Sequence, residues 1–321
     1  MPIISVIIPT YNRAELLKRC LNTVLSSGLE NMEVLVADND SHDHTEEILN
    51  SFKDGRLRFW RNERNLGAEK SVMNLLKAAR GKWVVCLTDD DYLLPNALES
   101  LLKVIESDPE LGVILSSVNV VNEFGNHLYK YEFYPKTTKF SAGMEALYHL
   151  CWAAHIFSRI TVRRQWLDLS GTERHLDSMY PQMYFVGTLL KDHPGFYLGE
   201  PLVTHTVGNK VFWEYPKDYM VAARIRMIND MLSGPRWEKE RKLLLDQLIE
   251  QIAKYNMPLW WKKSAIAWVF SQIQILRNKE IAFSYCYWKS LPIFLIGRLK
   301  KSLKTNRVKT KHMIRKLMNA I

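Results

Sequence analysis

The stretch Ile3–Arg13, read as IISVIIPTYNR, decides the fold of this chain. Its first seven residues form an almost unbroken apolar, β-branched run, which is typical of a parallel strand that is buried on both faces. Residues 13–27 follow with apolar side chains at helical spacing, which predicts a helix. A strand that leads directly into a helix is the repeating unit of an α/β sheet, so this stretch sets the fold class.

The same alternation of strand and helix continues to about residue 121. Further strands are predicted over 33–38, 57–61, 83–87 and 112–121, and further helices over 45–52, 68–80 and 95–105. Gly81 is predicted as the C-cap of the helix that precedes it. The expected architecture is a Rossmann-like, mostly parallel sheet with flanking helices, in which ligands bind beyond the carboxyl ends of the strands.

The second part of the chain has a different pattern. Its predicted segments are a hairpin turn over 121–126, a strand over 156–162 and a helix over 178–190. From about residue 214 nearly every segment has helical spacing. We therefore expect an α/β domain over residues 1–212, followed by a helical C-terminal region over 213–321.

The charge of the chain is unevenly distributed. The 321 residues are 47% hydrophobic and 24% charged, which excludes a disordered or fibrous protein. The formal net charge is +10, yet residues 236–321 contain 19 Lys/Arg and 5 Asp/Glu, whereas residues 1–235 contain 25 and 29. Such asymmetry indicates that the basic end binds a membrane surface or a nucleic acid.

Aromatic residues favour the membrane among these two partners. The basic end contains the tryptophans Trp237, Trp260, Trp261, Trp268 and Trp288. Helices that combine Trp with flanking Lys and Arg are typical of the interface of an anionic leaflet. The alternative is a helical bundle with a solvated basic face, and no sequence motif supports binding to nucleic acid.

The sequence also predicts a cellular location. No uncharged apolar run approaches the ~18 residues that cross a bilayer, and no basic leader precedes the first strand, so we expect neither a spanning helix nor a signal peptide. The cysteines are Cys20, Cys86, Cys151 and Cys286. Because they have no close spacing, we interpret them as buried thiols in a reducing compartment. The expected location is the cytoplasm, peripheral on the inner face of the cell membrane.

Polar side chains follow three of the predicted strands, at the edge where ligands bind. Thr10–Arg13 follow the first strand, Asp38–Ser41 the second, and Thr88–Pro95, read as TDDDYLLP, the fourth. Three adjacent aspartates repel one another unless a cation offsets their charge. Mg²⁺ and Mn²⁺ bind carboxylates and bridge them to substrate phosphates. The triplet therefore predicts a metal–diphosphate site, with a solvated acidic turn as the alternative.

Four motifs occur in an order and spacing that resemble the inverting glycosyltransferases of family 2, which have the GT-A fold. They are Ser5–Arg13, Val36–Ser41, Asn65–Gly67 and Ala79–Pro95. The similarity is strong over residues 3–120 and weaker over 155–210. The resemblance implies a nucleotide-sugar-binding half over 1–120 and an acceptor half over 121–212.

The resemblance also implies which residues bind the donor. They are Pro9, Thr10, Tyr11, Arg13, Asp38, Asn39, Asn65, Gly67, Lys70 and Asp89. Of these, Thr10, Tyr11, Arg13 and Asp38 are expected around the base. Asn39 stands where the family often has an acid that faces uracil. An amide both donates and accepts hydrogen bonds, whereas a carboxylate only accepts. The sequence therefore does not decide whether the donor nucleoside is uridine, thymidine, cytidine or guanosine. For Lys70, a solvated helix-face lysine is the alternative.

Metal and catalytic residues follow from the same resemblance. The DXD-like motif and a later polar segment suggest Asp90, Asp91 and His205 as ligands of Mg²⁺ or Mn²⁺, which would neutralise a diphosphate leaving group. For His205, a buried structural histidine is equally open. Asp177 is the first candidate for the base that deprotonates the acceptor hydroxyl, and Glu173 is the second. A helix N-cap is the alternative for Asp177.

The function implied by the resemblance is a metal-dependent transfer of a hexosyl or deoxyhexosyl group from a nucleotide sugar to a glycan hydroxyl. The expected setting is bacterial polysaccharide biosynthesis of the O-antigen or capsule type. The acceptor would be linked to polyprenyl diphosphate, and the basic end would dock on the anionic membrane that carries it. Two alternatives are a nucleotidyltransferase acting on sugar phosphates, for which the Gly-rich phosphate loop is missing, and a non-catalytic membrane-associated scaffold.

Overall fold

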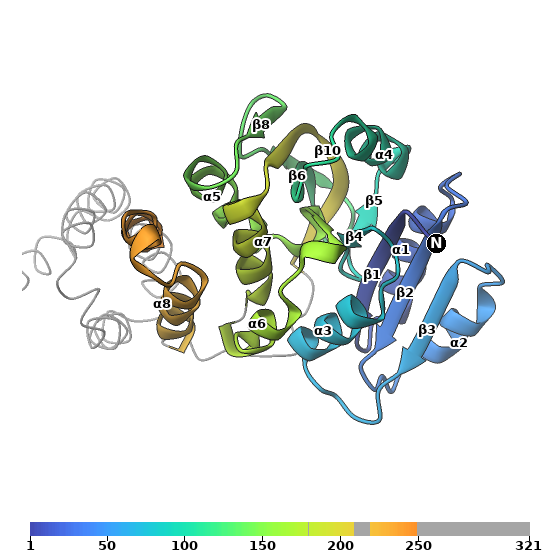
Figure 1. Ribbon diagram of the computed structural model, residues 1–321. Coiled ribbons are helices and arrows are strands. Elements are labelled where there is room, and N and C mark those ends of the chain that lie inside the picture. The colour runs from blue at the N-terminus through green and yellow to red at the C-terminus, as the bar shows by residue number, and fades with distance from the viewer. Residues whose placement is uncertain (179, 209–218, 249–321) are drawn as a thin grey trace, which may run out of the picture. The chain divides into compact units, whose positions relative to one another are not determined.

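The structure is a computed structural model that describes residues 1–178, 180–208 and 219–248 (Figure 1). The chain divides into two compact units, Met1–Tyr215 and Pro216–Ile321. Most of the predicted basic helical region, from residue 249 onward, lies outside the described residues, as does Cys286. No helix among the described residues is long and apolar enough to cross a membrane.

The first unit alternates strands and helices as its sequence predicts. The strands are β1 (Ile4–Thr10), β2 (Met32–Asp38), β3 (Leu57–Arg61), β4 (Trp83–Cys86), β5 (Tyr92–Leu93), β6 (Val113–Asn122), β7 (His127–Tyr131), β8 (Thr138–Phe140), β9 (Ile160–Arg163) and β10 (Gly195–Val207). The α-helices are α1 (Ala14–Leu25), α2 (Thr45–Ser51), α3 (Ala68–Ala78), α4 (Ala97–Ser107), α5 (Met144–Leu150), α6 (Leu169–Glu173) and α7 (Pro181–Asp192). In the second unit, α8 (Tyr219–Met231) precedes a 3-10 turn at Pro235–Trp237.

These strands form one sheet in the order β3-β2-β1-β4-β9-β6-β10-β5, with β7 paired to β6 and β8 to β10. The pairs β3–β2, β2–β1, β1–β4 and β6–β10 are parallel. Strand β9 runs antiparallel to both of its neighbours, β4 and β6. Because β6 therefore points the same way as β4, the carboxyl ends of β1, β2, β4, β6 and β10 share one edge. The predicted α/β class with a mostly parallel sheet is confirmed.

Helices cover both faces of this sheet (Figure 1). On one face, α1 and α4 pack through Leu17, Leu21 and Leu101 into a hydrophobic core cluster, which includes Ile4 and Val36. Helix α3 packs against β1 and β2 on the other face, and α7 packs there against β6. Burial on both faces explains why the first strands are continuous apolar runs without alternation.

Gly81 differs from the prediction in its physical role. Helix α3 ends with Ala79 as its C-cap, so Gly81 does not cap it. Instead the Gly81 N–H donates to Ser5 Oγ at 2.7 Å. A Cβ at position 81 would lie 2.5 Å from the backbone nitrogen of Ser5. Glycine is therefore required because two backbone segments approach closely, and not because a helix ends there.

The elements after residue 121 match their predictions less closely. The hairpin turn joins β6 to β7 as expected, but the predicted strand 156–162 contains the 3-10 turn Phe157–Arg159 before β9 begins. The predicted helix 178–190 begins three residues later, as α7. The described cysteines, Cys20, Cys86 and Cys151, are free and buried, which agrees with the expectation of buried thiols.

Candidate functional site

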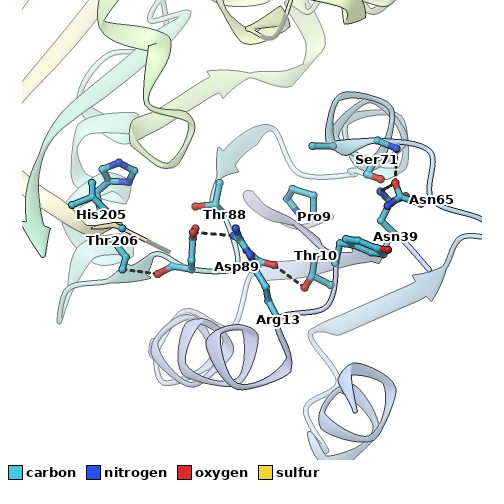
Figure 2. Close-up of a pocket in the computed structure, with 16 residues that line it drawn as sticks. Pro9, Thr10, Arg13, Asn39, Asn65, Ser71, Thr88, Asp89, His205 and Thr206 are labelled. Atoms are coloured by element: carbon cyan, nitrogen blue, oxygen red, sulfur yellow. Dashed lines mark hydrogen bonds and ion pairs between the residues drawn. The ribbon is translucent and has the colours of Figure 1, made fainter. Parts of the chain in front are cut away.

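A pocket of about 510 Å³ lies at the shared carboxyl edge of the sheet (Figure 2). Residues that follow β1, β2 and β4 line it, together with the start of α3 and the end of β10. Ten residues predicted from the sequence are among those that line it: Pro9, Thr10, Tyr11, Arg13, Asn39, Asn65, Gly67, Asp89, Asp90 and His205. A concave site of this size at this edge is where α/β sheets bind nucleotides.

One end of the pocket is built from acids and an arginine, and we call it the acid end. Arg13 Nη1 donates to Asp89 Oδ1 at 3.0 Å and to Asp90 Oδ2 at 2.9 Å. Thr10 Oγ1 donates to the other oxygen of Asp89 at 2.8 Å. Burial raises the pKa of Asp89 to about 7, against the opposing effect of Arg13. The acid end is therefore a desolvated place where charges require a partner.

The third aspartate of the triplet, Asp91, has a structural role. Its side chain is 1% exposed and accepts from the backbone N–H of Thr206 at 2.8 Å. His205 Nδ1 lies 3.0 Å from Asp91 Oδ2. Burial of the ring opposes protonation, but the hydrogen bond and charge of Asp91 outweigh it and raise the pKa of His205. Asp91 thus fixes the end of β10 against the loop Thr88–Asp91 after β4, which we call the aspartate loop, while His205 still lines the pocket.

The opposite end of the pocket is built from amides, and we call it the amide end. Asn39 Oδ1 accepts from the Leu66 N–H at 2.8 Å and from Asn62 Nδ2 at 3.0 Å. Asn39 Nδ2 donates to Asn65 Oδ1 at 2.6 Å, and this oxygen also accepts from the Gly67 N–H at 2.9 Å. Because backbone N–H groups only donate, they fix the orientation of both side-chain amides. The amide nitrogen of Asn65 can therefore donate to a ligand.

Two residues expected at the donor do not line the pocket. Asp38 is buried, and its Oδ1 accepts from the Ser41 N–H at 3.0 Å, so its carboxylate holds the turn after β2. Lys70 is an exposed residue of α3, which agrees with the solvated alternative. Arg13 lines the pocket, but at the acid end, because the adjacent carboxylates attract its guanidinium.

Neither candidate for the catalytic base lines the pocket. Glu173 is at the end of α6 with a 48% exposed side chain, and it pairs with Lys77 Nζ at 2.6 Å. Lys77 is in the last turn of α3, whereas the first turn of α3 borders the pocket. Asp177 is half-buried in the 3-10 turn Leu176–Ser178, which contacts α3 and α7. Asp177 is not an N-cap, because that position of α7 belongs to Tyr180.

The predicted metal ligands are only partly brought together. Among residues 1–178, 180–208 and 219–248, no group of three or more His, Cys, Asp and Glu side chains is arranged to hold a metal. The Asp91 carboxylate contacts Thr206 and His205 of β10. Asp90 has the most exposed carboxylate of the triplet, at 15%. One carboxylate is enough for a hard divalent cation when water and substrate phosphates complete its shell, so Asp90 fits such a cation.

Several residues at the pocket were not predicted from the sequence. They are Ala68, Ser71, Thr88, Thr206, Val207 and Gly208, with Asn62 behind the amide end. Arg19 also contributes, because its Nη2 donates to the backbone oxygen of Asp90 at 2.6 Å and to Thr206 Oγ1 at 3.1 Å. The position of Thr206 at a strand end would have indicated it, had β10 been predicted as a neighbour of β6.

Comparison with known proteins then identifies the family. The model of the family described as "Glycosyl transferase family 2" matches residues 5–165, which are half of the chain. The chain belongs to glycosyl transferase family 2. The matched span contains the amide end and the whole aspartate loop of the pocket, so the family membership and the geometry concern the same residues.

Curated family members and solved structures agree with this assignment. "Uncharacterized glycosyltransferase MJ1057" of Methanocaldococcus jannaschii is 35% identical over 143 residues, 43% of this chain and 49% of that protein. "GalNAc(5)-diNAcBac-PP-undecaprenol beta-1,3-glucosyltransferase" of Campylobacter jejuni is 33% identical over 106 residues, 32% of this chain and 34% of that protein. The matches span about half or less of these relatives.

The fold is similar to that of S. aureus TarS. The crystal structure of TarS 1–349 in complex with UDP-GlcNAc superposes with a TM-score of 0.67, covering 86% of this chain and 79% of that one. The sequence identity is 17%, so this likeness concerns the fold alone. It confirms the GT-A architecture that the family resemblance predicted.

Proposed function

We propose that this member of family 2 transfers a hexosyl or deoxyhexosyl group from a nucleotide diphosphate sugar to a glycan hydroxyl, with inversion at the anomeric carbon. The observation that carries this proposal is the two-ended pocket. Its amide end, at Asn39 and Asn65, offers hydrogen-bonding groups for a base. Its acid end, at Arg13 and Asp90, offers a guanidinium for a diphosphate and a carboxylate for a cation.

The acid end would hold the leaving group. Mg²⁺ or Mn²⁺ bound at Asp90 would supply neutralisation of the charge that develops on the departing diphosphate. Arg13 supplies a second positive charge at the same place, and its guanidinium matches two phosphate oxygens. His205 is held through Nδ1 by Asp91, which leaves Nε2 to contact the diphosphate or its sugar.

The proposed reaction is a direct displacement. The acceptor oxygen forms a bond to the anomeric carbon as the bond to the diphosphate oxygen breaks, and the proton of the acceptor hydroxyl passes to a carboxylate. We favour Asp177 as that base. Glu173 is the second candidate, but its exposed carboxylate is already paired with Lys77.

The acceptor that we propose is a glycan linked to polyprenyl diphosphate, as in bacterial surface-polysaccharide assembly. The name of the Campylobacter relative, with its undecaprenol-linked acceptor, supports this class of substrate. In this proposal residues 1–120 bind the donor, residues 121–212 bind the acceptor, and the basic region 213–321 docks on the anionic inner face of the cell membrane. Loss of liposome binding on truncation after residue 248 would support the last assignment, and unchanged, salt-insensitive binding would contradict it.

The function is tested with a panel of sugar nucleotides in the presence of Mn²⁺, by measuring the release of nucleoside diphosphate. We expect turnover with one donor and loss of at least about 100-fold in kcat for Asp90→Asn. Asp192→Asn, which changes an exposed aspartate at the end of α7, is the control and should retain full activity. Formation of a nucleoside triphosphate and a sugar phosphate when inorganic pyrophosphate is added to the sugar nucleotide would indicate a nucleotidyltransferase. No turnover and no nucleotide binding would indicate a scaffold.

A further inference from the structure

The position of Arg13 has a consequence for how the pocket is filled. A single terminal nitrogen, Nη1, contacts carboxylate oxygens of both Asp89 and Asp90, at 3.0 and 2.9 Å. The Arg13 side chain is only 11% exposed, so the guanidinium is enclosed between the carboxylates and does not extend into water. Figure 2 shows Arg13 beside Asp89 at the acid end. In this arrangement the guanidinium is a cation that contacts both carboxylates of the aspartate pair.

The carboxylate of Asp90 that Arg13 contacts is also the one that a divalent cation would bind. Asp90 is the carboxylate of the triplet that fits such a cation, and its Oδ2 already accepts from Arg13. A metal–oxygen bond is about 2.0–2.2 Å long. A divalent cation at that distance would lie close to the guanidinium. Because both are positive and the site is poorly solvated, they would repel each other. Arg13 and the cation are therefore competitors for Asp90.

The diphosphate of a nucleotide sugar offers Arg13 another partner. Guanidinium groups bind phosphate oxygens with two parallel hydrogen bonds, which are stronger than those between neutral groups. Asp89 also accepts from Thr10 at 2.8 Å, so it would retain a hydrogen-bond donor if Arg13 turned toward a ligand. Once Arg13 has turned away, the Asp90 carboxylate no longer shares its Oδ2 with a guanidinium, and a cation can bind there without that competitor. The nucleotide and the cation thus favour the same state of Arg13.

We propose that Arg13 is a positioning residue that makes divalent-cation binding and nucleotide binding interdependent in this protein. This inference rests on the proposed function, because it takes a nucleotide diphosphate as the ligand of the pocket. In the ligand-free protein, Arg13 excludes the cation from Asp90. The diphosphate draws the guanidinium away, and the cation then binds. Because coupling between two sites is reciprocal, the cation strengthens nucleotide binding by the same factor.

The test measures Mn²⁺ binding to the full chain by electron paramagnetic resonance, first with Mn²⁺ alone. Arg13→Gln should bind Mn²⁺ about tenfold more tightly than the wild type, because the competitor is removed. Arg13→Lys keeps the charge and should fall between the two, which also tests the proposal if Arg13→Gln folds poorly. Asp90→Asn added to Arg13→Gln should abolish the gain. A Mn²⁺ affinity that is unchanged or weaker in the folded Arg13 variants overturns the proposal.

Arg19→Gln is the matched control. Arg19 lies beside the same loop but donates to the backbone oxygen of Asp90 and to Thr206, not to a carboxylate. Its Mn²⁺ affinity should change less than about twofold. An equal gain in Arg19→Gln would show that net charge governs binding, and this would overturn the proposal.

The coupling between nucleotide and cation is measured with one nucleotide. It is chosen from UDP, GDP, dTDP and CDP as the one that raises the thermal stability of the wild type most. That nucleotide should raise the Mn²⁺ affinity of the wild type by about tenfold, and that of Arg13→Gln by less than about threefold. Equal factors in both proteins overturn the proposal. The donor panel separates this failure from failure of the proposed function, since turnover by the wild type is independent of how Arg13 couples the ligands.

Discussion

The carboxylate of Asp91 and the ring of His205 meet at 3.0 Å although 114 residues separate them in the chain. The same carboxylate accepts from the backbone N–H of Thr206 at 2.8 Å. Together these contacts join the aspartate loop after β4 to the end of β10. One side of the pocket is therefore closed by contacts between the loop after β4 and β10, and not by the motifs that follow β1 and β2.

Replacing Asp91 with alanine should lower the free energy of unfolding, because Asp91 has a structural role. The buried N–H of Thr206 would lose its acceptor, which costs about 1–3 kcal/mol in the free energy of unfolding. Urea denaturation with and without nucleotide measures this loss. Asp91→Asn keeps an acceptor for Thr206 and should lose less stability. Equal stability of Asp91→Ala and the wild type would contradict the structural role of this residue.

The close approach at Gly81 gives a second prediction. In Gly81→Ala the new Cβ would lie 2.5 Å from the Ser5 nitrogen, so β1 or the chain before β4 must shift. We expect a loss of about 1–3 kcal/mol in the free energy of unfolding. Gly55→Ala is the control, because no atom lies within 4 Å of a Cβ placed there. Thermal denaturation of the pair should show a lower melting temperature for Gly81→Ala alone.

The amide network predicts that Asn39→Asp is not a conservative change. A carboxylate oxygen would replace the Nδ2 that donates to Asn65 Oδ1, and Asn65 cannot turn without losing the Gly67 N–H. We expect a loss of about 1–3 kcal/mol in stability and a changed preference among UDP, GDP, dTDP and CDP. Isothermal titration measures the preference. Asn50→Asp, at an exposed position of α2, should change neither property.

The proposed base predicts different effects at two nearby carboxylates. Asp177→Asn should lower kcat by about 10²–10⁴-fold while nucleotide affinity stays the same, because only the proton acceptor is lost. Glu173→Gln should lower kcat by less than about threefold, since its exposed pair with Lys77 contributes little. Steady-state kinetics with the donor found in the panel measures both. The reverse order of effects would assign the base to Glu173.

Much of the first half of the fold could be predicted from local sequence. The run Ile3–Pro9 contains no alternation because helices cover both faces of β1, and this pattern is visible without a structure. The same is true of the polar residues at strand ends, which parallel pairing brings to one edge. Residues at the ends of β1, β2 and β4, such as Thr10, Asn39 and Asp90, line the pocket for this reason.

The remaining contacts depend on pairing between distant segments. Nothing local indicates that β9 inserts antiparallel between β4 and β6, or that β10 lies beside β6. The partner of Asp91 cannot be predicted without that pairing, so the sequence places Asp91 among the metal ligands. The sequence places Arg13 around the base for a similar reason, since its position in a motif does not show that Asp89 and Asp90 lie within reach of its guanidinium.

The closure of the pocket by β10 has a consequence for the order of folding. Contacts such as Arg19 to Thr206, separated by 187 residues, form late because chain ends far apart must first meet. During synthesis, the four parallel strands β1 to β4 can assemble well before residue 208 emerges from the ribosome. The nascent protein would thus acquire its parallel half first and its complete pocket last, which delays formation of the site until the first unit is almost entirely made.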